Sequence, residues 1–490
     1  MPARCLRGPA RYVQVGVRIV QSVTSAVMEV IRYGSAQGRW VIAAAVLGSG
    51  IAFLDGSVVN SALPKIREDL GATLAGQQWV VTGYLLTLGS LLVVGGSLGD
   101  RFGRRRLFVF GLVGFSVTSL LCGLAPNLGW LVFGRIVQGV SAAALVPGSL
   151  AMLSSVFHPD DRARAIGAWS GLASVSTALG PFLGGWLIDS VSWRWIFLIN
   201  PLIAVVPITL ALRWIPETRN ETADGVDVTG GVLLSVALAG IVYALIEGPS
   251  SRWPAVAIVA GIVGVLAMVT FAMFEGRTSS PMVPLSLFRS RQFSGANATT
   301  FVVWGAIGAV FFLLTLHLQN DLGYSALEAG AASLPITIMM ALFAARGGAL
   351  AQRIGPRIPM TVGPLIIGSG FALMTMIKPG HRYVATVLPA VLVFGVGLVL
   401  TVAPLTATVL AAVDDRFAGV GSAVNNAVSR IASLLVIAVI PSLAGIAGGA
   451  SSLGQGFSRA MWLCASLCVV GALISVMTIT NGHDADRRRS

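Results

Sequence analysis

The sequence predicts an all-α polytopic membrane protein that crosses the bilayer fourteen times. Of its 490 residues, 55% are hydrophobic and only 11% are charged, and the mean hydropathy is +0.83. Apolar runs of about 20 residues, long enough to cross a bilayer, recur along nearly the whole chain. Backbone polar groups cannot stay unpaired in lipid, and unbroken apolar runs exclude the alternating pattern of a β-barrel. We therefore expect helices throughout.

The apolar runs place the spans in order along the chain. Turns that carry charged residues, Gly or Pro separate neighbouring runs. An even number of spans returns the chain to the side of the membrane on which it started. The predicted spans are residues 40–62, 78–98, 107–125, 129–155, 165–188, 195–213, 229–247, 254–274, 294–319, 328–351, 359–377, 383–411, 418–447 and 459–480.

Two motifs occur twice along the chain, which indicates two related halves. Residues 95–105 are echoed by residues 347–357, and residues 160–167 are echoed by residues 414–421. Two separate landmarks thus recur at nearly the same spacing. The simplest account is two six-span bundles of common origin with two extra spans inserted between them. Parallel repeats of this kind are typical of alternating-access carriers.

These echoes divide the chain into five predicted segments. At the N-terminus, polar residues spaced three or four apart among valines and isoleucines predict an amphipathic helix on the inner membrane surface. The alternative is a misassigned start, with Met28 as the true initiator. The segments are a cytoplasmic N-terminal segment (1–39), an N-terminal six-span bundle (40–213), a linker with two extra spans (214–293), a C-terminal six-span bundle (294–480) and a cytoplasmic tail (481–490).

The distribution of positive charge predicts the orientation. A net charge of +13 would suggest a nucleic-acid partner for a soluble protein. Here most of the 33 Lys and Arg residues fall in the tail and loops of one predicted face. This asymmetry follows the positive-inside rule and predicts that both termini are cytoplasmic. We therefore expect the lipid bilayer, and not nucleic acid, as the partner of this charge.

The sequence lacks the patterns that soluble catalysis needs. It has no phosphate-binding Gly-Lys-Ser/Thr loop, no nucleophile elbow and no cluster of metal ligands. We therefore expect no enzymatic activity, no cofactor and no metal. An ion gradient, rather than ATP, would have to supply the energy for transport.

Two charged residues inside predicted spans are the sharpest functional candidates. Asp55 lies near the middle of the first span, where an ionised side chain costs roughly 2.5–3.5 kcal/mol. Such a residue usually lines a wet cavity, where it could hold a proton or a cationic substrate in turn. Arg135 lies in the fourth span and needs an acidic or carbonyl partner. In the alternative interpretation, both residues only hold helices together.

The turn between the second and third predicted spans carries one acid and four arginines. Its glycines allow two helices to approach closely, and a carboxylate is stabilised at the positive end of a helix dipole. The alternative is that the arginines only hold the loop in the cytoplasm. The candidate gating residues in this turn are Gly96, Asp100, Arg101, Gly103, Arg104 and Arg105.

Six motifs, in order, resemble the major facilitator superfamily and, within it, the fourteen-span drug:proton antiporter branch. The turn at Asp100 is similar to the signature loop of that superfamily at every defined position, and the resemblance covers roughly residues 40–480. The matching segments are residues 54–64, 79–84, 96–105, 135–139, 180–185 and 193–201.

The resemblance implies a major facilitator fold and assigns roles to several residues. Asp100 would contact the start of the span near residues 419–422 and hold the cytoplasmic side shut. Arg135 would pair with Asp55, since the first and fourth spans both line the cavity face of the N-terminal half in this family. Gln138 and Asn60 would belong to the same proton-coupling or substrate site. The segment assigned to antiport direction and to sealing the periplasmic side contains Gly180, Pro181, Gly184 and Gly185.

The second half of the chain is poorer in charge. Gln352 stands where the echo of Asp100 would be, so any lock in this half is weaker. Asn425, Asn426 and His317 are candidates for a substrate cavity, although a lone intramembrane His is more often structural. No acid lies at mid-depth in the later spans, which argues against a preference for divalent cations.

The sequence as a whole predicts a proton-coupled exporter of hydrophobic, cationic or amphiphilic small molecules. We expect a monomer in the bacterial inner (cytoplasmic) membrane that works by alternating access as a multidrug efflux antiporter. One alternative keeps the fold but exports a single metabolite, lipid or self-made antibiotic. A second alternative is a membrane scaffold or sensor that no longer transports; the presence of Asp55, Asp100 and Arg135 argues against it.

Overall fold

The computed structural model describes residues 31–219, 225–278, 281–414, 418–446 and 453–481. The predicted amphipathic helix falls mostly on residues 1–30, and most of the C-terminal tail falls on residues 482–490, so both lie outside the described residues. The described helices are α2 (Ala36–Leu70), α3 (Leu74–Phe102), α4 (Arg104–Gly123), α5 (Leu128–Val156), α6 (Pro159–Ser190), α7 (Trp195–Trp214), α8 (Val228–Ser250), α9 (Ala255–Glu275), the short 3-10 helix η1 (Leu285–Arg289), α10 (Arg291–Asn320), α11 (Ala326–Ala332), α12 (Leu334–Ile354), α13 (Arg357–Met374), α14 (Tyr383–Ala411), α15 (Ala418–Leu443) and α16 (Gly454–Thr478).

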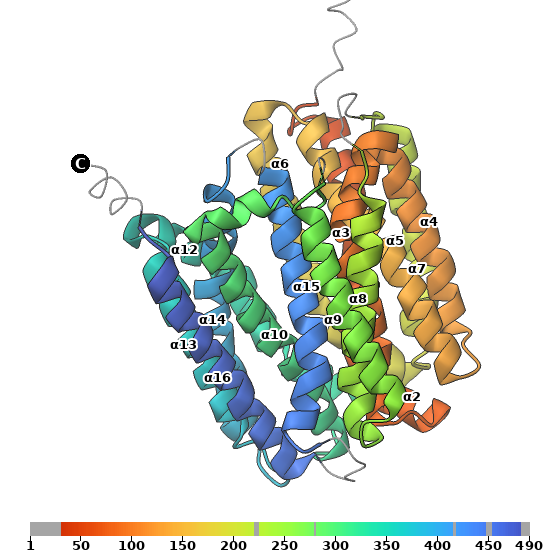
Figure 1. Cartoon of the computed structure of the whole chain (residues 1–490), viewed down its shortest axis with the longest axis vertical. Coiled ribbons are helices and arrows are strands. Elements are labelled where there is room, and N and C mark those ends of the chain that lie inside the picture. The colour runs from red at the N-terminus through yellow and green to blue at the C-terminus, as the bar shows by residue number, and fades with distance from the viewer. Residues whose placement is uncertain (1–30, 220–224, 279–280, 415–417, 447–452, 482–490) are drawn as a thin grey trace, which may run out of the picture.

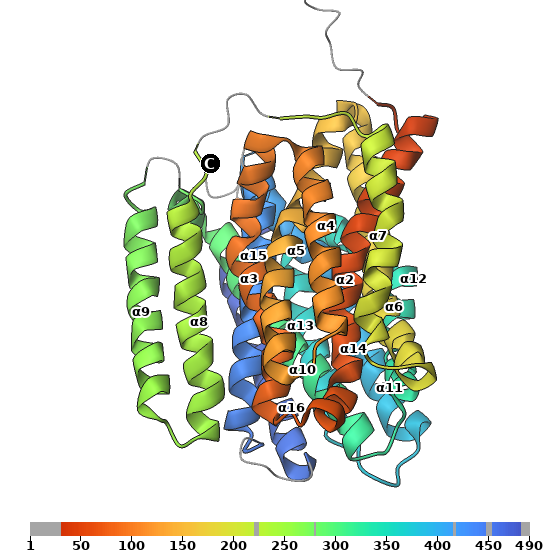
Figure 2. The same cartoon turned by 90° about the vertical axis from the view of Figure 1, so that its right-hand side faces the viewer.

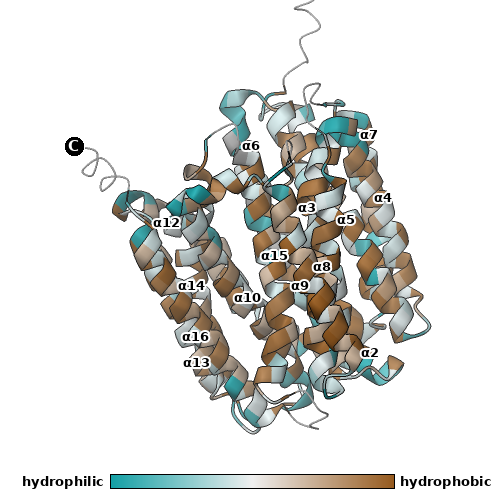
Figure 3. Ribbon diagram, in the orientation of Figure 1, coloured by the Kyte–Doolittle hydropathy of each residue, from teal (hydrophilic) through white to brown (hydrophobic). Residues whose placement is uncertain are grey.

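The prediction of an all-α polytopic membrane protein is confirmed. Thirteen helical segments of the described chain are long and apolar enough to cross a membrane, with α11 and α12 together forming one of them. Helix α6 has 32 residues and packs between α2 and α11, so it supplies a further span that agrees with the predicted fourteen. Each predicted span falls on one of these helices. Figure 3 shows apolar residues along the helix shafts and hydrophilic residues gathered at the helix ends.

Local sequence signals explain where the helices begin and end. Thr73 caps α3 by accepting a hydrogen bond from the backbone N–H of Gly76, and Asn127 caps α5 in the same way. Gly71 ends α2 with a φ of 65°, a left-handed conformation that glycine adopts without a steric cost. Short polar turns therefore separate long apolar helices, as the sequence predicts.

The helices pack in two groups with a hairpin beside them (Figure 1). Helices α2–α7 contact one another, and helices α10–α16 contact one another. Helices α8 and α9 form an antiparallel hairpin that stands at one side of the molecule (Figure 2). Gly240 and Gly264 let the backbones of the hairpin touch, and Trp79 Nε1 donates a 2.9 Å hydrogen bond to Glu247 Oε1 to attach α8 to α3.

The two groups touch at one end of the molecule and as far as the middle of α3 and α15. We call this end the Asp189 face, and we call the opposite end, which carries the turn between α3 and α4, the Asp100 face. Gln78 Nε2 in α3 donates to the Ile437 carbonyl in α15 at 2.7 Å, and Gln319 Nε2 in α10 donates to the Ser61 carbonyl in α2 at 3.0 Å. Both side chains lie toward the Asp189 face, so this end holds the groups together.

Candidate functional site

A buried hydrogen-bond network surrounds Asp55 in α2. Its Oδ2 accepts from Arg135 Nη1 at 2.5 Å, and its Oδ1 accepts from Gln138 Nε2 and Asn200 Nδ2 at 3.3 Å each. The side chains of Asp55 and Arg135 are 0% and 1% exposed. The ion pair expected from the sequence is therefore present, and Gln138 joins it as expected, also accepting from Arg135 Nη1 at 2.7 Å.

The remaining surroundings of Arg135 hold its guanidinium in place. Its Nε donates to the Val80 carbonyl at 3.1 Å, and its centre lies 4.4 Å from the centroid of the Tyr84 ring. Tyr84 in turn donates to the Ala52 carbonyl. A planar guanidinium can bind a carboxylate and a ring face at the same time, which a lysine would do less well. Helices α2, α3, α5 and α7 thus meet at one charge pair.

Sequence reasoning missed two residues of this network. Asn200 joins Asp55 to Ser119 Oγ, to which it donates at 2.9 Å, and Tyr84 stacks on Arg135. Both residues stand at the ends of motifs that the sequence analysis used only for family resemblance. The sequence did contain a signal for both: Asn200 is an amide and Tyr84 a phenol inside predicted spans, and each stands in a motif that begins with a tryptophan.

The network does not face an open cavity. Asp55 is fully buried inside the group α2–α7, and its three donors come from helices α5 and α7 of the same group. The expectation that Asp55 lines a wet cavity and could hold a cationic substrate directly is therefore not met in this conformation. The physical reason is that Arg135 already neutralises the carboxylate and fills the space beside it.

Asn60, grouped with Asp55 by the sequence analysis, stands apart from this network. It lies more than one helical turn further along α2, and its Oδ1 is buried without a hydrogen-bond partner among the described residues. The structure therefore does not bring Asn60 into contact with Asp55, Arg135 or Gln138.

The turn at Asp100 is ordered by interactions within its own end of the molecule. Arg104 Nε and Nη2 donate to Asp100 Oδ1 at 2.9 and 2.7 Å. Gly103 has a φ of 109°, which few other residues adopt. The backbone N–H groups of Arg105 and Arg106 donate to the carboxylate of Glu217, which the sequence analysis did not single out. Arg101 extends over the ring of Phe102.

The expected contact between Asp100 and residues 419–422 is absent from this conformation. Asp100 binds Arg104 one turn away, and a methyl group placed on Gly419 would meet nothing within 4 Å. Helices α3 and α15 instead touch at Gln78 and, midway along both helices, at Gly89. Gly96, in the last part of α3, is near Pro147 of α5. The lock expected at the Asp100 face is therefore not formed here.

The segment at residues 180–185 makes the closest contacts between α6 and its neighbours. Gly180 and Gly184 fit against Ser57 and Val58 of α2, whereas Gly185 fits against Ala326 at the start of α11. A side chain at any of these glycines would collide with the neighbouring helix. The Pro181 carbonyl lies against Gly330 of α11. This segment therefore joins the two groups of helices at the Asp189 face.

An aspartate that the sequence analysis did not single out completes that contact. Asp189 ends α6, and its two carboxylate oxygens accept from the backbone N–H groups of Ala326 and Leu327 at 3.2 and 2.8 Å. A carboxylate at a helix N-terminus satisfies free N–H groups and interacts favourably with the helix dipole. The Asp189 face is thus closed by a capped helix as well as by glycine packing.

The three candidates for a substrate cavity in the second half lie in different surroundings. His317 Nδ1 is 2.6 Å from Asp321 Oδ2, and its Nε2 is 3.0 Å from the Ile377 carbonyl, so both ring nitrogens face acceptors. Asn425 donates to Asn297 and Thr300 of α10, within its own group of helices. Asn426 is exposed. Asn426 is therefore exposed, Asn425 is half-buried and His317 is buried, and the side chains of Asn425 and His317 already have hydrogen-bond partners.

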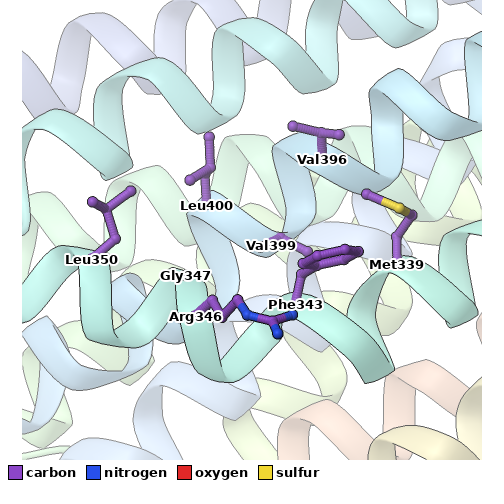
Figure 4. A pocket seen from close by; sticks show the side chains of 8 residues that line it. All are labelled: Met339, Phe343, Arg346, Gly347, Leu350, Val396, Val399 and Leu400. Atoms are coloured by element: carbon purple, nitrogen blue, oxygen red, sulfur yellow. The ribbon is translucent and has the colours of Figure 1, made fainter.

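A small apolar cavity of about 260 Å³ lies between α12 and α14 (Figure 4), and no residue of the Asp55 network lines it. Arg346 is its only charged lining residue; its guanidinium lies 5.2 Å from the Phe343 ring centroid and donates to the Leu342 carbonyl at 3.1 Å. The other lining residues are Met339, Phe343, Gly347, Leu350, Val396, Val399 and Leu400. No carboxylate lines this cavity.

Comparisons with known proteins agree with this architecture. The model of the family described as the Major Facilitator Superfamily matches residues 45–437. Multidrug resistance protein Stp of Mycobacterium tuberculosis is 36% identical over 81% of this chain and 74% of its own length. Puromycin resistance protein pur8 of Streptomyces alboniger is 35% identical over 82% of this chain and 81% of its own length. The tetracenomycin C resistance and export protein of Streptomyces glaucescens is 35% identical over 81% of this chain and 74% of its own length.

Solved structures share the fold at much lower identity. The crystal structure of a POT family transporter in complex with 5-aminolevulinic acid has a TM-score of 0.69 to this chain and is 12% identical. The match covers 92% of this chain and 98% of that one. At this identity the likeness bears on the fold alone, and it extends over nearly all of both chains.

Proposed function

Because the chain belongs to the major facilitator superfamily, we propose that it exports hydrophobic, drug-like small molecules from the cell in exchange for protons. It is a multi-pass membrane transport protein and not an enzyme. The proposal of drug export is supported by its relatives, whose names refer to multidrug resistance, to puromycin resistance and to tetracenomycin C export. The proposal of proton exchange is carried by the buried pair of Asp55 and Arg135.

Proton coupling follows from what a proton would do to this pair. Protonation of Asp55 removes the negative charge that compensates Arg135, and a buried guanidinium without that charge is strongly destabilised. The network links α2, α3, α5 and α7, so its rearrangement would change how these helices pack. Proton binding would then bias the balance between two conformations. In this scheme Asp55 carries the proton, and the substrate binds elsewhere.

The arrangement of contacts supports a cycle of alternating access. The two groups of helices are joined at the Asp189 face through Gln78, Gln319 and Asp189, whereas Asp100 at the other face binds only within its own turn. We assign the Asp100 face and both termini to the cytoplasm, on the charge distribution. The conformation would then face inward, and a contact between Asp100 and residues 419–422 would belong to the outward-facing state.

The grouping of the helices also underlies our assignment of domains. Residues 40–213 and 294–480 would form the two moving bundles, and residues 214–293 with the hairpin α8–α9 would accompany the first through the contact of α8 with α3. We propose that one chain is sufficient for transport, because the contacts that open and close lie between helices of the same chain. The protein would act in the bacterial cell membrane.

The function is tested with purified protein in proteoliposomes that carry an imposed pH gradient. We expect wild-type protein to exchange a drug for protons and Asp55→Asn to abolish gradient-driven transport. Asp69→Asn is the matched control, because Asp69 lies on the same helix and also pairs with an arginine, Arg194, but at the exposed end. Wild-type rates in Asp55→Asn would remove Asp55 from coupling. If no drug from a broad panel releases protons with wild-type protein, drug:proton exchange itself is wrong.

A further inference from the structure

The helices α10–α16 carry positive charge inside the membrane without a matching acid. Within their described bounds, α10 and α12–α16 contain no Asp or Glu, and Glu328 of α11 is used in the capping box of that short helix. Arg346 and Arg430 nevertheless lie well inside α12 and α15. Asp321, just beyond α10, is held by His317 and by the backbone N–H groups of Leu453 and Gly454. Neither arginine pairs with an acid of this group among the described residues: Arg346 donates to a backbone carbonyl, and Arg430 lies against an aromatic ring.

Arg430 stands at the contact between the two groups of helices. It lies midway along α15, and a methyl group placed on Gly89, midway along α3, would be 3.3 Å from the Arg430 Cβ. Its guanidinium centre lies 5.8 Å from the centroid of the Phe53 ring in α2. The side chain is only half-buried at this depth. Arg430 therefore reaches from one group of helices toward the other in the middle of the protein.

The guanidinium of Arg430 has no acceptor among the described residues. None of their hydrogen bonds or ion pairs involves it, and its cation–π contact is with the face of Phe53. A guanidinium has five N–H donors, which a ring face does not satisfy. A cation left in this condition inside a membrane protein is costly and usually marks a pathway or a ligand site. A ligand that carries a negatively charged hydrogen-bond acceptor would satisfy these donors.

The surroundings of Arg430 suit an aromatic ligand. Phe53 packs against Trp169 of α6 with ring centroids 6.3 Å apart, and Trp169 Nε1 is held by Ser49 Oγ at 2.7 Å. Exposed Asn426 lies one turn before Arg430 on the same face of α15. The position therefore combines a cation, an accessible amide and two aromatic side chains.

We infer that Arg430 anchors the substrate, and that the preferred substrates are planar aromatic molecules bearing a carboxylate or an ionised phenol. This inference rests on the proposed export function and names its substrate class. The planar guanidinium matches the two oxygens of a carboxylate, and the rings of Phe53 and Trp169 can pack against the aromatic part of the ligand. This class differs from the cationic substrates expected from the sequence, because Asp55 is enclosed by Arg135 and the half-buried charge of Arg430 is positive.

Two dyes with the same ring system and opposite charge test this inference by direct binding. Fluorescein is anionic near neutral pH, whereas tetramethylrhodamine methyl ester is cationic, and both contain a xanthene ring. Their fluorescence anisotropy is titrated with the purified full-length protein in detergent. We expect wild-type protein to bind fluorescein more tightly than the rhodamine ester. Arg430→Gln should weaken fluorescein binding by about tenfold or more, as for loss of a charge-assisted hydrogen bond, and leave the rhodamine ester unaffected.

Two further variants separate anchoring from general effects. Arg430→Lys keeps the charge but loses the planar fork, so fluorescein binding should fall less than in Arg430→Gln. Arg346→Gln is the matched control, since it removes the other arginine of α10–α16 that lies deep within a helix, and it should leave fluorescein binding unchanged. Size-exclusion profiles establish that each variant is folded.

Three outcomes would overturn the inference: no fluorescein binding to wild-type protein, equal loss of both dyes in Arg430→Gln, or no loss of either. The proposed function is measured separately as proton-driven transport in proteoliposomes. Fluorescein binding that depends on Arg430, without any transport, would contradict the export function and leave the anchoring site standing. Transport of the rhodamine ester but not of fluorescein would support the export function and contradict the anchoring site.

Discussion

Arg135 and Arg430 both lie inside membrane-spanning helices, yet their surroundings are opposite. Arg135 in α5 is 1% exposed and binds Asp55, Gln138 and the Val80 carbonyl. Arg430 in α15 is half-buried, and among the described residues its guanidinium has no hydrogen-bond acceptor and lies against the ring of Phe53. The first group of helices therefore neutralises its charge internally, and the second presents its charge at the boundary between the groups.

This difference indicates that proton binding and substrate binding use different residues, although a single aspartate could serve both. A carboxylate enclosed by three donors suits a proton-dependent change in helix packing. A guanidinium that lacks an acceptor suits a ligand that brings one. We therefore propose that the proton binds within the helices α2–α7 and that the polar end of the substrate binds to the helices α10–α16.

The stability of the two arginine variants should differ most. Arg135→Gln leaves Asp55 without its charged partner in a buried site, which should cost about 3–5 kcal/mol of folding free energy. Arg430→Gln breaks no recorded ion pair and should change stability by less than about 1 kcal/mol. Unfolding in mixed micelles measures both. Equal losses of folding free energy in the two variants would show that Arg430 has a structural partner, and would contradict the contrast between the two arginines.

Removal of both members of the buried pair should restore stability without restoring function. The double variant Asp55→Asn with Arg135→Gln leaves neither charge uncompensated, so it should recover most of the loss of about 3–5 kcal/mol seen in Arg135→Gln alone. Proton-coupled transport should stay absent. Recovery of transport in the double variant would mean that the pair is only structural.

His317 provides an intermediate case within α10–α16. Its two ring nitrogens reach Asp321 and the Ile377 carbonyl, while its ring stacks on Phe457 at 4.0 Å between centroids. A glutamine cannot reach both acceptors, so His317→Gln should cost about 1–3 kcal/mol of stability. Binding of fluorescein should not change. A selective loss of dye binding with normal stability would instead place His317 in the substrate site.

Substitutions at the two faces should have the smallest effects, one on stability and the other on turnover. Asp189→Asn weakens the cap on α11 and should destabilise the present conformation by about 0.3–1 kcal/mol. Asp100→Asn removes a partly exposed pair with Arg104 and should change stability by about 0–1 kcal/mol. Its effect should appear as slower turnover, measured in proteoliposomes. Wild-type turnover in Asp100→Asn would show that Asp100 does not stabilise the outward-facing state.

Much of the architecture could be predicted from the sequence, because the bilayer restricts the choices. An apolar run of membrane length can satisfy its backbone only as a helix, and caps such as Thr73 and Asn127 mark the ends. The partner of Arg135 could be predicted for a related reason. A buried guanidinium needs an acceptor, and Asp55 is the acid nearest the middle of a span in the first half of the chain.

The sequence did not reveal which charges are enclosed and which are accessible. Asn200 and Tyr84 complete the network around Asp55 from α7 and α3, and their contribution depends on how four helices rotate against one another. Asp100 was expected near residues 419–422, but that contact depends on which end of the molecule is closed. Asp189 accepts from backbone N–H groups, which leave no residue pattern to read, and Glu217 meets Arg105 and Arg106 from a segment more than 100 residues away in the sequence.

The helical character of the chain, the positions of its membrane spans and the presence of an acid and an arginine deep within them can be read from the residues alone. These properties follow from hydrophobicity and hydrogen bonding along a single segment. The enclosure of Asp55 by Arg135 and the position of Arg430 beside the neighbouring helices are visible only in the folded protein. Exposure and pairing depend on the packing angles between helices distant in sequence, and a local pattern does not specify those angles.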